Sequence, residues 1–278
     1  MKRMLLSAVC GMLATVIAVA SVDAQPQPIT VTTAPTGTVS ASKAQQVLDQ
    51  SAEDGKFTLI VFYKEETAAV RTMFQVAKDG VAKRKDRTAV TFVQIADPAE
   101  KALVERFDVA RAPMPMTMVV ARNGAITGVF SRQLADESLD AAIVTPTMTR
   151  CMKSLQEQKL VFVCVQTTEQ PLVPAAVKNM QADPQFKDRI VLVSMQLNDP
   201  EEARFLSQMQ IDAKQIKGVT AVLLAPPGLL IGKYDSLATK EQVAAALHKA
   251  GKCCDDPNCK HNHGAAPQAT QPSKTRRN

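Results

Sequence analysis

The chain contains one long internal repeat, and this repeat limits the folds it can adopt more than any other feature. At an offset of 102 residues, "KDRTAVTFVQIADPAEKALVERFDV" from residue 85 matches "KDRIVLVSMQLNDPEEARFLSQMQI" from residue 187. Upstream, the same offset lays "FTLIVFYK" from residue 57 over "KLVFVCVQ" from residue 159. A repeat about one domain long indicates a duplicated domain rather than a solenoid of short units.

The periodicity of apolar residues predicts alternating helices and strands in each copy. A continuous apolar strand requires helices on both faces of its sheet, so each copy should be an α/β domain with a mixed central sheet flanked by helices. An Asp-Pro pair, Asp97-Pro98 or Asp199-Pro200, marks a helix start in both copies. For the first copy we expect helices over 42–53 and 67–84, strands over 57–63 and 88–96, a hairpin around Asn123-Gly124 and a closing helix over 134–144.

This order, αβαβαββα with a parallel start and an antiparallel end, resembles the thioredoxin family. Family members usually read F-x-x-x-W-C-x-x-C-K at the exit of the first strand. The first copy has "FYKEETAAVR" from residue 62, with Thr67 and Val70 at the places of the two cysteines. In the second copy the offset places Glu169 and Leu172 there. The resemblance therefore implies tandem thioredoxin-like domains that lack a C-x-x-C motif.

The family also has a cis-proline before its hairpin, beside a groove that faces the substrate. In the first copy Pro115 is the best match, with Pro113 as a rival. A gap-free alignment puts Thr220 at this place in the second copy, where we expect an ordinary trans peptide, because a non-proline cis bond costs about 3 kcal/mol. The resemblance thus implies a groove in the first copy alone. We expect its binding residues to be Tyr63, Thr67, Val70, Met114 and Pro115.

Two cysteines lie within the repeated part of the chain. Cys164 is in the central strand of the second copy, where the offset lays it over Phe62, and burial competes with a role as a nucleophile. Cys151 lies on a predicted helix at the junction of the copies. We expect both to be structural.

Three methionines alternate around Pro115, namely Met114, Met116 and Met118. Thioethers beside a groove could bind a soft ion such as Cu(I) or a hydrophobic peptide, but alternation is also what strand packing produces. We expect at most two of the three to share a face of the sheet, with core packing as their main role.

The last part of the chain, "GKCCDDPNCKHNHG" from residue 251, gathers thiols and imidazoles within eleven positions. Thiolate and imidazole are ligands that Zn(II) and Cu(I) prefer, although this spacing fits no standard zinc finger. A metal site, a disulfide or intermolecular link, and the absence of any role all remain open. The candidate metal ligands are Cys253, Cys254, Cys259, His261 and His263.

The first residues have the pattern of a secretory signal: Lys2 and Arg3 precede an apolar run and a plausible cleavage site after Ala24. We expect export to the periplasm or the extracellular space, with no transmembrane span after removal of the signal. The expected organisation is a signal peptide over 1–24, a linker over 25–37, domains over 38–144 and 146–250, and a disordered Cys/His tail over 251–278.

The charge distribution argues against nucleic-acid binding. The formal net charge is +6, but residues 251–278 hold five Lys or Arg against two Asp, so half of that charge belongs to the tail. With two Tyr, nine Phe and no Trp, the chain also lacks aromatic residues interleaved with a basic face. No nucleotide-binding, hydrolase or zinc-protease signature is present, and neither copy has a C-x-x-C motif, so an enzyme is not the expected class and the question stays open.

The leading hypothesis is therefore an exported, redox-inactive protein that binds a protein or peptide partner or acts as a scaffold, as non-catalytic domains of the protein disulfide isomerase family do. The alternative is a thiol or metal-handling protein that works through its tail, with Zn or Cu as the possible ion. The sequence names no ligand, pathway or oligomeric state.

Overall fold

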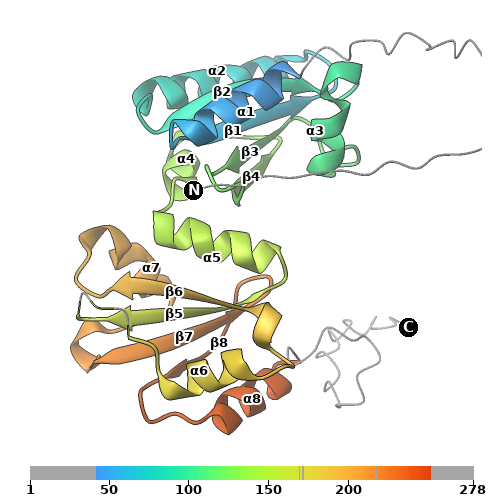
Figure 1. Cartoon of the computed structure of the whole chain (residues 1–278). Coiled ribbons are helices and arrows are strands. Elements are labelled where there is room, and N and C mark those ends of the chain that lie inside the picture. The colour runs from blue at the N-terminus through green and yellow to red at the C-terminus, as the bar shows by residue number, and fades with distance from the viewer. Residues whose placement is uncertain (1–41, 169, 171, 217, 252–278) are drawn as a thin grey trace, which may run out of the picture. The chain divides into compact units, whose positions relative to one another are not determined.

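The structure is a computed structural model that describes residues 42–168, 170, 172–216 and 218–251. These residues form two four-stranded sheets, each built from its own stretch of chain (Figure 1). The expected signal peptide, the linker and residues 252–278 of the expected tail lie outside the described residues. Within the described part of the chain, no helix combines the length and the apolar character that a membrane span needs.

The first domain comprises the elements up to the fourth helix, and its sheet mixes parallel and antiparallel pairs. In chain order the elements are α1 (Lys43–Glu53), β1 (Phe57–Tyr63), α2 (Ala68–Lys83), β2 (Thr88–Gln94), the 3-10 turn η1 (Pro98–Glu100), α3 (Lys101–Arg106), β3 (Met116–Val120), β4 (Ile126–Ser131) and α4 (Asp136–Ala142). The strand order is β2-β1-β3-β4, with β1 parallel to β2 and antiparallel to β3. Strands β3 and β4 form the predicted hairpin.

The second domain repeats this arrangement with a shorter second helix. Its elements are α5 (Pro146–Gln156), β5 (Leu160–Gln166), α6 (Ala175–Ala182), η2 (Lys187–Arg189), β6 (Ile190–Gln196), η3 (Pro200–Glu202), α7 (Ala203–Gln208), η4 (Ala213–Gln215), β7 (Val219–Ala225), β8 (Leu229–Tyr234) and α8 (Lys240–Lys249). The strand order is β6-β5-β7-β8, with the same directions as in the first sheet. The expected duplication of an α/β domain is thus present.

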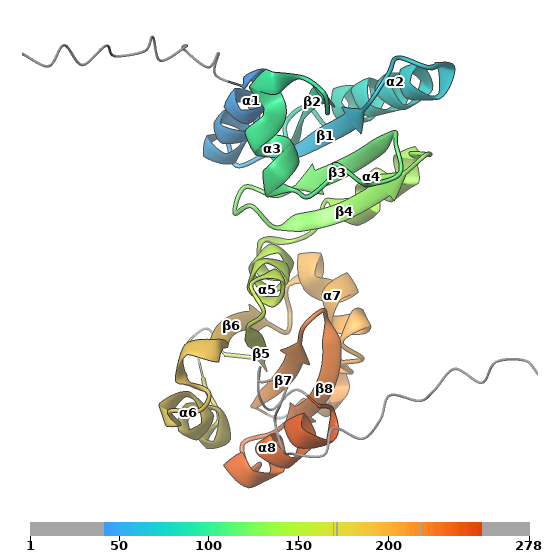
Figure 2. The same ribbon diagram turned by 90° about the vertical axis from the view of Figure 1, so that its right-hand side faces the viewer.

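Each sheet is covered by helices on both faces (Figure 2). In the first domain, Ile60 and Phe62 of β1 pack with residues of α1 and α3, while Leu59 and Val61 pack with residues of α2 and α4. In the second, α5 and α7 cover one face of the sheet, and α6 and α8 cover the other. Because alternate strand residues face opposite sides, the central strand is buried along its length and reads as a continuous apolar run.

The strand pairing corrects the alignment of the two copies by one residue. Phe57 pairs with Thr88, whereas Leu160, not Lys159, pairs with Ile190. Cys164 therefore takes the place of Val61 rather than that of Phe62. A shift of one residue moves a strand side chain to the other face of the sheet, so the gap-free offset gave Cys164 the wrong face.

The same correction applies to the hairpin. Met116 pairs with Phe62, and Thr220 pairs with Val165, which is the residue equivalent to Phe62. Thr220 therefore corresponds to Met116, and Val219 corresponds to Pro115. Among the described residues the cis bonds are Met114-Pro115 and Pro226-Pro227, so the expected trans peptide before Thr220 is confirmed.

A buried carboxylate at the same place in both domains fixes the start of the first helix. Glu100 accepts hydrogen bonds from the Ser42 hydroxyl and from the backbone N–H of Ala44, at the start of α1. Glu202 accepts a hydrogen bond of 2.8 Å from the hydroxyl of Thr145, the N-cap of α5. Their side chains are 6% and 4% exposed. The repeated Asp-Pro-x-Glu sequence thus caps its own turn and holds a helix that is distant in the sequence.

Candidate functional site

The end of β1 in the first domain carries the predicted groove residue Tyr63. Its half-buried ring makes an edge-to-face contact with Phe74 of α2, with ring centroids 5.0 Å apart and planes at 82°. Burial raises the pKa of the Tyr63 phenol, and the carboxylates of Glu66 and Asp97 raise it further. Strand exit and helix start thus present a neutral phenol close to two acidic side chains.

The two positions that replace the dithiol have different surroundings. Thr67 is exposed and is the N-cap of α2, where its hydroxyl accepts a hydrogen bond of 3.3 Å from the N–H of Val70. Val70 is only 2% exposed and packs inward. A partner at this surface would touch Thr67 but not Val70. The cap explains the local fold, because threonine satisfies an otherwise unpaired N–H in the first turn.

The remaining predicted groove residues, Met114 and Pro115, lead into β3 through a cis peptide bond. Because Phe62 pairs with Met116, Pro115 lies beside Tyr63 at the end of the strand pair. Pro115 is buried, and its carbonyl accepts a hydrogen bond of 2.7 Å from the N–H of Arg132. The structure thus gathers Tyr63, Thr67, Met114 and Pro115 at one edge of the first sheet.

At the equivalent place in the second domain, Gln166 ends β5 and is fully buried. Its amide nitrogen donates to the carbonyls of Thr168 and Gln170, both at 2.9 Å, and its amide oxygen accepts a hydrogen bond of 2.7 Å from the N–H of Leu172. One side chain therefore holds the loop that stands where a dithiol loop would be. No sequence pattern singled out Gln166, because a strand-terminal glutamine is usually solvated.

Both cysteines in the described part of the chain are free thiols in the second domain. Burial raises the pKa of Cys151 to about 12 and that of Cys164 to about 11. Cys151 packs on the face covered by α5 and α7, and Cys164 packs on the face covered by α6 and α8. The sheet separates the two thiols, so they cannot act as a pair, and each stays protonated near neutral pH.

Comparisons with known proteins found similar solved structures. No family profile and no curated protein match the chain. Among solved structures, thioredoxin O2 of Arabidopsis thaliana matches at 12% identity and a TM-score of 0.29, covering 36% of this chain and 82% of its own. A disulphide isomerase of Xylella fastidiosa matches at 16% and 0.28, covering 36% and 84%. The zinc-bound form of human ERp44 matches at 12% and 0.32, covering 74% and 58%.

The strand order and strand directions of both sheets are those expected from the sequence, and they decide the fold. The chain folds as two tandem thioredoxin-like domains. The helices and strands of both domains agree with the resemblance, and so does the cis-proline Pro115 of the first domain. The dithiol positions of the first thioredoxin-like domain hold Thr67 and Val70.

The methionines of the first thioredoxin-like domain belong to its core. Met116 and Met118 are each 4% exposed, and half-buried Met114 packs against the same cluster. The expectation that at most two of the three share a face is wrong, because residues two apart along a strand lie on the same side. Core packing accounts for Met116 and Met118, and Met114 is the most exposed of the three.

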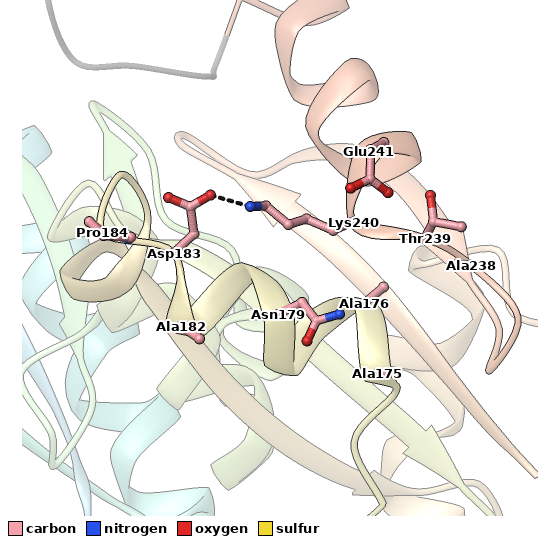
Figure 3. A pocket seen from close by; sticks show the side chains of 10 residues that line it. All are labelled: Ala175, Ala176, Asn179, Ala182, Asp183, Pro184, Ala238, Thr239, Lys240 and Glu241. Atoms are coloured by element: carbon pink, nitrogen blue, oxygen red, sulfur yellow. Dashed lines mark ion pairs between the residues drawn. The ribbon is translucent and has the colours of Figure 1, made fainter.

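Surface hollows in the second thioredoxin-like domain lie beside its last helix. One is lined by residues of β7, β8 and the following loop, including Thr220, Tyr234 and Leu237, a leucine that is 85% exposed. Another lies between α6 and α8, where Asp183 and Lys240 form an ion pair (Figure 3). Sequence reasoning singled out neither hollow.

Within the described residues, no three side chains of His, Cys, Asp or Glu come together as a metal site would require. The predicted ligands of the tail, Cys253, Cys254, Cys259, His261 and His263, lie outside the described residues. The hypothesis of a tail metal site therefore stays a prediction.

Proposed function

We propose that the chain is an exported, redox-inactive tandem thioredoxin-like protein that binds a protein or peptide partner, or acts as a scaffold, through the groove edge of its first domain. The observation that carries this proposal is the state of the thiols. The first domain has Thr67 and Val70 at its dithiol positions, and the two described thiols are buried on opposite faces of the second sheet. Disulfide exchange needs an accessible thiolate and a resolving partner.

The groove edge of the first domain has the side chains that peptide binding uses. Tyr63 offers a partly exposed aromatic surface, Thr67 an exposed hydroxyl, and Met114 an adaptable thioether. Aromatic residues dominate the energetics of protein interfaces, and methionine adjusts to different apolar partners. The second domain has Gln166 instead of a tyrosine at the strand exit, so we assign binding to the first domain.

The first experiment tests redox inactivity. Wild-type chain and a variant with Cys253, Cys254 and Cys259 replaced by serine are compared in an insulin-reduction assay. We expect no turnover from the serine variant. Activity in the wild type alone would support the tail-based alternative, and activity that disappears on Cys164→Ala would contradict the proposal, because a buried core thiol would then be reactive.

The second experiment tests binding. An array of extended peptides is probed with the wild type, with Tyr63→Ala and Met114→Ala, and with Leu237→Ala as an exposed control in the second domain. Loss of a central aromatic side chain should weaken binding by about tenfold. Equal binding by all four proteins would reject the first-domain groove as the contact surface.

The alternative function uses the Cys/His tail to bind Zn or Cu or to exchange disulfides. Three cysteines and two histidines within eleven positions favour it, since four of them satisfy tetrahedral Zn(II). Metal analysis and thiol titration of the purified chain, with and without residues 252–278, distinguish this alternative from the groove. Bound metal that is lost with the tail would support it, whereas a metal-free protein with freely accessible thiols would reject it.

A further inference from the structure

The last helix of each domain is tied to the end of the second helix by ion pairs, and the charges are reversed between the domains. In the first domain, Arg84 caps α2 and donates to Asp136, the first residue of α4, with Nη1 and Oδ1 2.8 Å apart. In the second domain, Asp183 caps α6 and pairs with Lys240, the first residue of α8 (Figure 3). The acid belongs to the last helix in one domain and the base in the other.

Both contacts are partly sheltered from water. The Arg84 side chain is 13% exposed, and it also donates to Asp140, with Nε and Oδ1 2.7 Å apart, and to the carbonyl of Gly80. The hydrogen bonds from Arg84 and from Lys83, whose Nζ lies 2.9 Å from Oδ2 of Asp136, lower the pKa of Asp136 to about 2. The hydrogen bonds to Asp140 and Asp136 raise the pKa of Arg84. In the second domain the Asp183 side chain is 18% exposed, and the hydrogen bond from Lys240 lowers its pKa.

The two domains offer equivalent docking places to their closing units. We call β3-β4-α4 and β7-β8-α8 the closing units, because each completes a sheet whose other two strands precede it in the chain. Both sheets have the same strand order and directions, so each closing unit would find strands of the same order and direction on the other sheet. Tandem copies of one fold are prone to exchange of equivalent elements during folding, within a chain or between chains.

An exchanged closing unit would meet like charge. Docking of α4 in the second domain would bring Asp136 to Asp183, and docking of α8 in the first would bring Lys240 to Arg84. Both correct pairings are attractive and both exchanged pairings are repulsive. Discrimination of this kind needs an unfavourable interaction in the wrong complex as well as a favourable one in the right complex.

Side-chain size also differs between the two closing units. A Cβ on Gly80, one turn before Arg84, would lie 2.4 Å from Cδ1 of Leu139 in α4, so that leucine packs into the space a glycine leaves. The residue of α8 at the position of Leu139 is the smaller Val243, which packs with Ala176, Val177 and Met180 of α6.

We propose that the reversed ion pairs determine which closing unit docks on which domain, and that they suppress docking of a closing unit on the non-equivalent domain, whether of the same chain or of another. This device concerns assembly, and it stands independently of the binding function proposed above.

The test reverses the charges of the second domain in the full chain, with Asp183→Arg and Lys240→Asp together. This variant keeps an attraction within the second domain but gives both domains the same polarity. Wild type and variant are refolded from denaturant at low salt with reductant, and native monomer is separated from dimers by size exclusion. We expect the ratio of monomer to exchanged dimer to fall about fivefold, which corresponds to the upper end for a surface ion pair.

Two controls separate pairing specificity from stability. Reversal of the exposed pair Lys101 and Glu105 in α3, as Lys101→Glu with Glu105→Lys, should leave the ratio unchanged. Wild-type chain refolded in 1 M salt, where the Debye length is about 3 Å, should shift toward the variant's ratio. A variant ratio equal to that of the wild type would overturn the proposal. If the variant does not fold, the wild-type salt series decides, because a ratio that does not change with salt also overturns it.

Discussion

The last residues of the strands β1 and β5 occupy equivalent positions in the two domains but make different contacts. Tyr63 ends β1 and Gln166 ends β5, and the pairing with β2 and β6 makes them equivalent. The tyrosine packs its ring on Phe74, and the carbonyl of Lys64 in the following loop accepts a hydrogen bond from the side chain of Gln94, the last residue of β2. In the second domain the glutamine itself contacts three loop backbone groups. The residue at this position therefore contacts another aromatic ring in the first domain and loop backbone groups in the second.

The largest expected effect comes from removing those loop contacts with Gln166→Met, which keeps the volume but loses the amide. Three hydrogen bonds at about 1 kcal/mol each predict a loss of about 3 kcal/mol from the stability of the second domain. Urea unfolding measures the loss, and hydrogen exchange at the Leu172 N–H locates it. The matched variant Tyr63→Leu should cost about 1 kcal/mol, since it loses only an aromatic contact. Similar losses in both variants would break the contrast between the two edges.

The second comparison concerns the buried carboxylates Glu100 and Glu202. Glu100 accepts hydrogen bonds from a hydroxyl and from a backbone N–H, whereas Glu202 accepts a hydrogen bond from the Thr145 hydroxyl. We expect Glu100→Ala to cost about 2 kcal/mol and Glu202→Ala about 1 kcal/mol, because the first leaves a helix N–H without its partner. Denaturant midpoints of the two domains measure both losses. A larger loss from Glu202→Ala would show that the contacts of the two carboxylates do not predict which contributes more to stability.

The third comparison concerns helix packing at Gly80 and Asn179. Gly80→Ala should destabilise the first domain by about 1–3 kcal/mol, because Leu139 is buried and cannot move away from the new Cβ without strain. Asn179 is exposed, so Asn179→Ala should change stability by less than about 0.7 kcal/mol, in the stabilising direction, through helix propensity. Thermal unfolding of the two variants checks the difference. A stabilising Gly80→Ala would mean that propensity outweighs the close contact.

The sequence predicted the repeated fold well because the repeat, the apolar strands and the Asp-Pro caps are local signals. It misplaced Cys164 and Thr220 by one residue, because an insertion within a loop leaves no mark in a gap-free offset, although it changes the face of every strand residue. Of the predicted groove residues, Val70 is buried, since the sequence gives a helix position but not its rotation against the sheet. Gln166 and the reversed ion pairs were missed because their partners are distant in sequence or are backbone groups.

The smallest expected effect is a loss of stability in acid. It compares the ion pairs that tie the last helix to the second helix in each domain. The pKa values of Asp136, Asp140 and Asp183 are all lowered in the folded chain by hydrogen bonds from their cationic partners. A carboxyl whose folded pKa is lowered stabilises the fold above its unfolded pKa of about 4 and loses that contribution as pH falls through the folded pKa. For Asp136 the folded pKa is about 2, so the loss falls between about pH 4 and pH 2.

Arg84 forms ion pairs with two carboxylates, whereas Lys240 forms an ion pair with Asp183. The stability of the first domain should therefore be more sensitive to acid through these pairs. Hydrogen exchange of core amides in β3 and β7, followed from pH 5 to pH 2, measures each domain separately. Glu157 and Glu241 also have lowered pKa values in the second domain, so they contribute to its acid dependence as well. The variants Arg84→Gln and Lys240→Gln separate the contribution of the ion pairs from theirs. We expect Arg84→Gln to flatten the acid dependence of β3 more than Lys240→Gln flattens that of β7. The reverse order would show that the single pair of the second domain contributes more than the paired carboxylates of the first.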